Sequence, residues 1–143
     1  MWHYQGKEFT SDMIEEYVGF VYIITDQNEK SYVGKKLFQS TRRLPPLKGK
    51  TRKRKKVVES DWKTYFGSSD EVKALVEEHG ADSFRREILH LCSSKGVMSY
   101  LEAKEQFDRE VLLSNDYYNG IINCKIHKTH VRSLRDEERG NKR

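Results

Sequence analysis

One 22-residue stretch of the chain has the composition of a polyanion-binding segment. Between positions 35 and 56 there are 11 basic residues and no acidic one, whereas the other 121 residues hold 16 basic and 22 acidic residues. Cations at this density repel one another unless a polyanion neutralises them, and lysine and arginine are the side chains that contact phosphates. The segment therefore predicts phosphate binding, with a solvated loop or a localisation signal as alternatives. Its cations are Lys35, Lys36, Arg42, Arg43, Lys48, Lys50, Arg52, Lys53, Arg54, Lys55 and Lys56.

Two tyrosines, ten residues apart, could act on such a phosphate. Tyr22 lies in a β-branched and aromatic stretch, residues 18–25, and Tyr32 lies in a second stretch, residues 31–38. A polar turn separates the stretches, so they predict an antiparallel hairpin that brings the two phenols close together. Ordinary cross-strand aromatic packing is the alternative reading of the pair.

A glutamate in the predicted long helix, residues 98–114, is a candidate metal ligand. At about 100° per residue, Glu105 lies about 40° from Leu101 on the apolar face, whereas Glu102 lies about 100° away, toward solvent. A carboxylate on an apolar face needs a partner, which favours Glu105 over Glu102. Asp108 also points inward and is the second choice, because a lysine one turn before it offers an ordinary helix pair.

The elements that must position these residues follow one another as strand, strand, basic loop, two short helices, strand and long helix. This order predicts an α+β domain with a small three-stranded antiparallel sheet flanked by helices. Pro45 and Pro46 predict a loop over 35–58, because proline interrupts regular elements. The other expected elements are a short helix near 60–66, a helix capped by Ser69 and ended at Gly80, and a third strand over 84–91.

Five features in order along the chain resemble the GIY-YIG nuclease family. The paired half-motifs are Val21-Tyr22 and Tyr32-Val33-Gly34, and Arg42 follows at the spacing of the family's arginine, with Arg43 as a competitor. Glu105 lies in the late helix, and Tyr118-Asn119 resembles the closing element of the family. The resemblance covers roughly residues 19–119.

Segments 61–69, 79–84 and 87–89 further resemble the phage-type, free-standing homing endonuclease branch of this family. The resemblance divides the chain into an N-terminal extension (1–17), a GIY-YIG-like catalytic domain (18–124) with its basic DNA-binding loop (35–58), and a charged C-terminal tail (125–143).

The resemblance implies an endonuclease that hydrolyses DNA phosphodiester bonds with one Mg²⁺ or Mn²⁺ ion. Tyr22 would be the general base if neighbouring cations or the metal lowered its pKa, and Tyr32 would hydrogen-bond the water or phosphate. Arg42 would stabilise the phosphate, and Glu105 would hold the metal. The histidine that usually follows the arginine has no match here, so Tyr65 or Lys36 would supply an extra group. The alternative is a non-catalytic nucleic-acid-binding module of the same fold.

The expected partner is double-stranded DNA, with either a monomer or a dimer compatible with the sequence. The thiols of Cys92 and Cys124 are too few for a disulfide framework, so we expect no disulfide-linked partner and a cytoplasmic location, the host cytoplasm for a phage-encoded protein. No apolar stretch approaches the length of a membrane helix. Cys124, His127 and His130 have short spacings but no fourth metal ligand nearby.

Overall fold

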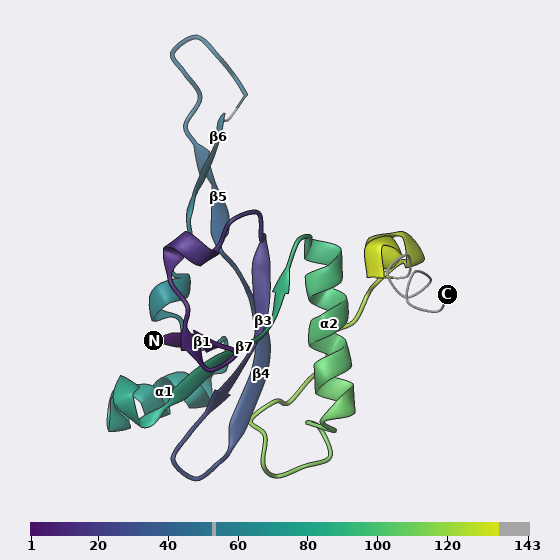
Figure 1. Cartoon of the computed structure of the whole chain (residues 1–143). Coiled ribbons are helices and arrows are strands. Elements are labelled where there is room, and N and C mark those ends of the chain that lie inside the picture. Colours follow the sequence, from purple (N-terminus) through teal and green to yellow (C-terminus); the bar gives the residue numbers. More distant parts are fainter. Residues whose placement is uncertain (53, 135–143) are drawn as a thin grey trace.

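The central element of the computed structural model is a five-stranded sheet with the order β2-β1-β7-β3-β4 (Figure 1). The structure describes residues 1–52 and 54–134. All neighbouring strands are antiparallel except β1 and β7, which are parallel. The strands are β1 (Trp2–Tyr4), β2 (Lys7–Glu8), β3 (Gly19–Thr25), β4 (Ser31–Leu37) and β7 (Arg85–Cys92).

The predicted hairpin and the third strand are confirmed. β3 pairs with β4 in a register that sets Tyr22 opposite Gly34 and Ile24 opposite Tyr32. On its other edge β3 pairs with β7 along its whole length. The sequence of β3 is apolar at nearly every position because this central strand is buried on both faces.

The prediction of only three antiparallel strands is wrong, because residues 1–17 supply two more. β1 adds to the outer edge of β7, and Trp2 is buried there with its indole nitrogen donating to the Trp62 carbonyl at 2.6 Å. Phe9 is buried in the same core. Strands of two or three residues are too short to show a periodic pattern, so the sequence carried no clear signal for them.

The basic segment is not the loop that its two prolines suggested. β5 (Gln39–Leu44) and β6 (Arg54–Glu59) form a separate antiparallel pair that projects from the end of β4 (Figure 1). Pro45 and Pro46 lie just beyond β5, in the turn, where they remove no hydrogen bond of the ladder. We call residues 39–59 the basic arm.

Two α-helices lie on opposite sides of the sheet (Figure 1). α1 (Asp70–His79) begins at the predicted cap, since the Ser69 hydroxyl accepts from the Val72 amide at 3.4 Å. α2 (Lys95–Asp108) begins earlier than predicted, after the cap Ser94, and ends earlier as well. The described residues also form short 3₁₀ helices: η1 (Ser11–Met13), η2 (Trp62–Thr64), η3 (Ala81–Ser83) and η4 (Lys128–Val131).

The sheet separates two hydrophobic clusters. On one face Phe20, Tyr22 and Ile24 pack with Phe38 and Trp62. On the other face the alternate residues of β3 pack against α2. Successive side chains of the edge strand β4 point to opposite faces of the sheet. Those on one face meet the aromatic cluster, and those on the other meet α2.

Three further expectations concern the termini and the thiols. Of the predicted charged tail, residues 135–143 lie outside the described residues. Over the described part of the chain, no helix is long and apolar enough to cross a membrane. Cys92 is buried, Cys124 is exposed, and both thiols are free.

Candidate active site

Tyr22 lies in the middle of the sheet with its hydroxyl over the backbone of Gly34. The side chain is 1% exposed. A Cβ atom on Gly34 would overlap the Tyr22 hydroxyl, so only glycine lets the phenol cross the edge strand here. Burial first, and then the neighbouring phenols of Tyr65 and Tyr32, raise the pKa of Tyr22 well above its ordinary value.

Tyr32, on β4, lies beside Tyr22 of β3 and is more accessible to solvent. The two ring centroids are 6.4 Å apart, and the Tyr32 side chain is half-buried. Its hydroxyl shares a hydrogen bond of 2.8 Å with the Ser68 hydroxyl. Burial raises the pKa of Tyr32, while the bond to Ser68 works against the rise. Gly67, at a φ of 91°, packs its backbone onto the Tyr32 ring and closes the loop over both phenols.

Lys36 and Tyr65 complete the phenol cluster on the same face. The Lys36 ammonium lies 4.0 Å from the centroid of the Tyr65 ring and 2.6 Å from a carboxylate oxygen of Asp61. The Tyr65 ring meets the Tyr22 ring edge-on, with centroids 6.0 Å apart. The cluster thus holds three phenols and one ammonium.

The loop that carries Tyr65 is fixed to the sheet by Arg86. This buried guanidinium donates to the carbonyls of Lys63 at 3.0 Å and Tyr65 at 2.9 Å, and it lies 4.2 Å from the centroid of the Phe66 ring. Burial lowers the pKa of Arg86 to about 10. Its donors are directed to backbone carbonyls, so we regard Arg86 as a positioning residue.

Glu102 approaches the phenols from α2, on the other face of the sheet. Its side chain is 14% exposed, and its carboxylate lies 4.0 Å from the Lys35 ammonium, which also donates to the Ser99 hydroxyl at 2.8 Å. Burial raises the pKa of Glu102, against the effect of Lys35. The charge of Glu102 in turn raises the pKa of both Tyr22 and Tyr32, so the carboxylate lies within electrostatic reach of the two phenols.

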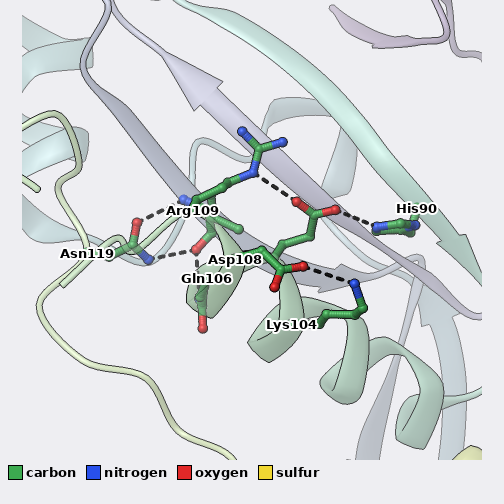
Figure 2. A network of polar contacts seen from close by, with 8 residues as sticks. His90, Lys104, Gln106, Asp108, Arg109 and Asn119 are labelled. Atoms are coloured by element: carbon green, nitrogen blue, oxygen red, sulfur yellow. Dashed lines mark hydrogen bonds and ion pairs between the residues drawn. The ribbon is translucent and has the colours of Figure 1, made fainter. Parts of the chain in front are cut away.

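Glu105, the glutamate preferred from the sequence, is held by an ion-pair network instead. Its two carboxylate oxygens bond to His90 and to Arg109, each at 2.8 Å (Figure 2). Burial acts to raise the pKa of Glu105, but these hydrogen bonds and charges outweigh it and lower the pKa. Asp108, the second choice, pairs with Lys104 at 2.9 Å as its position on the helix suggested (Figure 2).

Asn119 fixes the edge strand that carries Tyr32. Its amide oxygen accepts from the Val33 amide at 3.0 Å, and its amide nitrogen donates to the Val33 carbonyl at 2.8 Å (Figure 2). The Gln106 amide donates to the same carbonyl at 3.0 Å. The side chain of Asn119 thus satisfies the two backbone groups that an outer strand would otherwise pair.

Arg42 and Arg43 are not in the phenol cluster. Both lie on β5, where they stand opposite Lys56 and Lys55 of β6. The arm also carries Arg54, and its turn carries Lys48, Lys50 and Arg52, all exposed. Lys53 lies outside the described residues.

The structure brings together Tyr22, Tyr32 and Lys36 on one face of β4 and places Lys35 beside Glu102 on the other face. Arg42, Arg43 and Glu105 lie outside this group. Helix periodicity predicted that Glu102 faces solvent, because it shows only how far a residue lies from the apolar stripe of its own helix. No sequence signal could show that Glu102 meets the edge of the sheet, because that contact spans more than 60 residues of chain. Ser68 had no signal of its own.

Comparison with known proteins identifies the family of the chain. The family model described as "Putative endonuclease segE, GIY-YIG domain" matches residues 2–122 of the chain. No curated protein and no solved structure matches. The match includes both tyrosines, Gly34, Glu102 and Asn119, as well as the N-terminal strands. The chain is therefore a member of the GIY-YIG nuclease family, with a domain of the segE endonuclease type.

Proposed function

We propose that the chain is an endonuclease that hydrolyses phosphodiester bonds of double-stranded DNA with one divalent metal ion. The proposal rests on the approach of the Tyr22 and Tyr32 rings, with centroids 6.4 Å apart, and on the mostly buried Glu102 carboxylate, which lies 4.0 Å from the Lys35 ammonium and within electrostatic reach of both phenols. Hydrolysis needs a base for water, a cation for the phosphate charge and a ligand for the metal, and these residue types supply all three.

Glu102 is the proposed metal ligand in place of Glu105. Its carboxylate is mostly buried, and the one ion pair found for it among the described residues is the 4.0 Å approach of Lys35, too long for a direct hydrogen bond. Both oxygens of Glu105, by contrast, already bond to described residues. A partly neutralised carboxylate fits a hard cation such as Mg²⁺ or Mn²⁺.

The site offers the metal few protein ligands. No group of three or more histidine, cysteine, aspartate or glutamate side chains could hold a metal within residues 1–52 and 54–134. This count covers the pattern of Cys124, His127 and His130 as well. We therefore expect the ion to bind weakly without DNA, because it depends on water and phosphate oxygens for its other ligands. When bound, the ion would supply positive charge beside the phosphate.

Tyr32 is the proposed general base. Tyr22 is 1% exposed, and its hydroxyl is enclosed by Gly34 and the loop, whereas Tyr32 reaches the surface at the Ser68 hydroxyl. In this assignment the Tyr32 phenolate takes a proton from water, and the water oxygen bonds to phosphorus as the bond to the 3′ oxygen breaks. That oxygen takes a proton from solvent, which leaves 5′-phosphate and 3′-hydroxyl ends. Tyr22 supports the Tyr32 ring from behind as a positioning residue.

Lys35 is the proposed contact for the phosphate charge, the role that the sequence suggested for Arg42. Its side chain is 39% exposed, and it points to the same place as Glu102. Lys36 is engaged by Asp61 and Tyr65, so its charge acts on the phenols from within the cluster. The cations of the basic arm, Arg42 and Arg43 included, serve DNA binding away from the reacting atoms.

Cleavage of plasmid DNA in Mg²⁺ or Mn²⁺ tests the proposal, with Glu102→Gln and Glu105→Gln as a matched pair. We expect the wild-type protein to nick DNA, Glu102→Gln to lose at least a hundredfold in rate with unchanged DNA binding, and Glu105→Gln to keep cleaving. DNA that stays intact with wild-type protein at every metal and sequence tried, while still being bound, would make the chain a binding module without catalysis. Loss of cleavage in Glu105→Gln alone would return the metal to Glu105.

A further inference from the structure

The basic arm places like charges directly opposite one another. In the register of β5 and β6, Arg42 stands across from Lys56, and Arg43 stands across from Lys55. Like charges opposite each other destabilise an antiparallel pair. Among the residues that the structure describes, none of these four cations forms an ion pair within the chain. A ribbon of this kind is best stabilised by an external polyanion.

The arm is anchored firmly at its base. Phe38, 1% exposed, packs in the core between β4 and β5. The Ser60 amide donates to the Phe38 carbonyl at 2.8 Å, and the Ser60 hydroxyl donates to the Leu37 carbonyl at 2.6 Å. The Phe38 amide donates to the Val18 carbonyl at 3.0 Å. The arm thus continues β4, the strand of Tyr32, in a fixed direction (Figure 1).

The dimensions of the arm select one groove of DNA. Two paired strands lie about 5 Å apart, and their side chains make the ribbon too wide for a minor groove of about 6 Å. The major groove, about 12 Å wide, admits a two-stranded ribbon. The pleat directs Arg42 and Lys56 to one face and Arg43 and Lys55 to the other, so a ribbon in this groove has cations for the phosphates of both strands.

We propose that the basic arm is a β-ribbon that enters the major groove of duplex DNA on one side of the cleavage site. This inference rests on the proposed function, which supplies duplex DNA as the substrate. It adds which groove the arm enters and how far from the cut it binds. Arg42 follows Tyr32 by ten residues, which at about 3.3 Å per residue spans at most about 33 Å. At about 3.4 Å per base pair, Arg42 at the base of the arm binds within about one helical turn of the cut.

Binding to four probes without metal tests the choice of groove. The probes are a DNA duplex, the same duplex with bulky groups on pyrimidine C5 that fill the major groove, an RNA duplex and single-stranded DNA, all measured with Glu102→Gln. The A-form major groove of RNA is too deep and narrow for the ribbon. We expect the plain DNA duplex to bind at least tenfold more tightly than each of the others. Equal affinity for the plain and the filled duplex would overturn the inference.

Two double variants with the same loss of charge test the arm itself. Arg42→Ala/Lys56→Ala removes one opposed pair of the arm, and Lys7→Ala/Lys128→Ala removes two exposed lysines elsewhere. With six to eight phosphates neutralised by the arm, we expect a slope of log K against log salt of about −5 to −7 for the wild type. The arm variant should reduce the slope by about 2 and the control should leave it unchanged. Equal slopes in the two variants would contradict the inference.

Footprinting beside cleavage separates this inference from the proposed function. Protection of the major groove should be centred up to one turn from the nick, on one side only, and should disappear in the arm variant. If groove-dependent binding is found but no cleavage, the proposed function alone fails. If the arm variant cleaves with unchanged KM and an unchanged footprint, the groove inference alone fails.

Discussion

Glu102 and Glu105 lie almost one helical turn apart on α2, yet their surroundings differ. Glu102 lies 4.0 Å from Lys35 and within electrostatic reach of the two phenols, whereas Glu105 bonds to His90 and Arg109. The inward carboxylate of Glu105 does have partners, as its position on the helix suggested, and these partners are two side chains of the protein. His90 comes from β7, so this pairing depends on tertiary structure that helix periodicity does not contain.

The ion-pair network predicts that Glu105 contributes to stability rather than to catalysis. Its lowered pKa means that the contribution is complete above about pH 4.5 and is lost as the pH falls through the lower pKa of the folded state. We expect Glu105→Gln to reduce the free energy of unfolding by about 1 kcal/mol at pH 7, and the difference from wild type to shrink below pH 4. Urea unfolding at several pH values measures this. A difference that stays constant down to pH 3 would contradict the assignment.

The choice of Tyr32 as base predicts how activity depends on pH. Burial raises its pKa, so the phenolate is a minor species near neutrality and grows about tenfold with each pH unit. We expect log kcat/KM to rise with a slope near 1 from pH 7 to 9 in the wild type. The slope should persist, at a lower rate, in Tyr22→Phe and should disappear in Tyr32→Phe. A slope lost in Tyr22→Phe but kept in Tyr32→Phe would make Tyr22 the base, as first expected from the sequence.

Gly34 shows why the second half-motif needs a glycine. Any Cβ at this position would collide with the Tyr22 hydroxyl. We expect Gly34→Ala to displace Tyr22, to destabilise the fold by about 1 to 3 kcal/mol and to reduce cleavage strongly. In the double variant with Tyr22→Phe the shortest contact, that of the hydroxyl, is removed, but the ring carbon Cζ would still lie 2.7 Å from the new Cβ, so stability should recover only in part while the phenol stays absent. Thermal unfolding of both variants checks this, and equal melting temperatures for Gly34→Ala and wild type would show that the contact is not tight.

At the scale of elements, the hydrogen bonds at the outer edge of β4 hold the strand that carries Tyr32 in place. Asn119 is 86 residues away from Val33 in sequence but supplies both hydrogen bonds that an outer strand would make. The buried Gln106 side chain donates to the same carbonyl, while its own oxygen has no partner among the described residues. The closing Tyr-Asn element is therefore explained by the support it gives to the strand of Tyr32.

Removal of this support should affect both stability and activity. We expect Asn119→Ala to cost about 1 to 3 kcal/mol of unfolding free energy, because the Val33 amide loses the Asn119 oxygen and the Val33 carbonyl keeps only the Gln106 donor. The KM for DNA should change little, since the hydrogen bonds of the Asn119 side chain go to Val33 of β4 and not to the arm, while kcat should fall as β4 loosens. Asn115→Ala, in the preceding exposed turn, is the matched control. If both variants behaved alike in kcat, the support role of Asn119 would be refuted.

The hairpin, β7 and α1 could be predicted from sequence because their signals are local. Runs of β-branched and aromatic residues, a polar turn and the cap Ser69 each act within a few positions. The arm was mistaken for a loop because the two prolines were taken to interrupt the whole segment. They lie in its turn, and the strands on either side keep their ladder intact.

On the scale of the whole molecule, a single strand joins the cationic arm to the phenol cluster. β4 carries Tyr32, Lys35 and Lys36, and it continues through Phe38 into the basic arm. The sequence analysis predicted that the cationic segment and the tyrosines are the two functional features, and in the structure both lie along one continuous stretch of chain. The sequence could not show whether Arg42 and Arg43 lie near the tyrosines. A spacing of ten residues fits both a helix beside the site and an arm that leads away from it.

The position of a bound metal ion tests the central claim most directly. In crystals of the protein with Mn²⁺ and a short DNA duplex, the anomalous signal of manganese locates the ion without reference to activity. The account predicts a peak about 2.1 Å from a carboxylate oxygen of Glu102, beside Tyr32 and the scissile phosphate. A peak bound to Glu105, or one on a surface remote from both tyrosines, would contradict it.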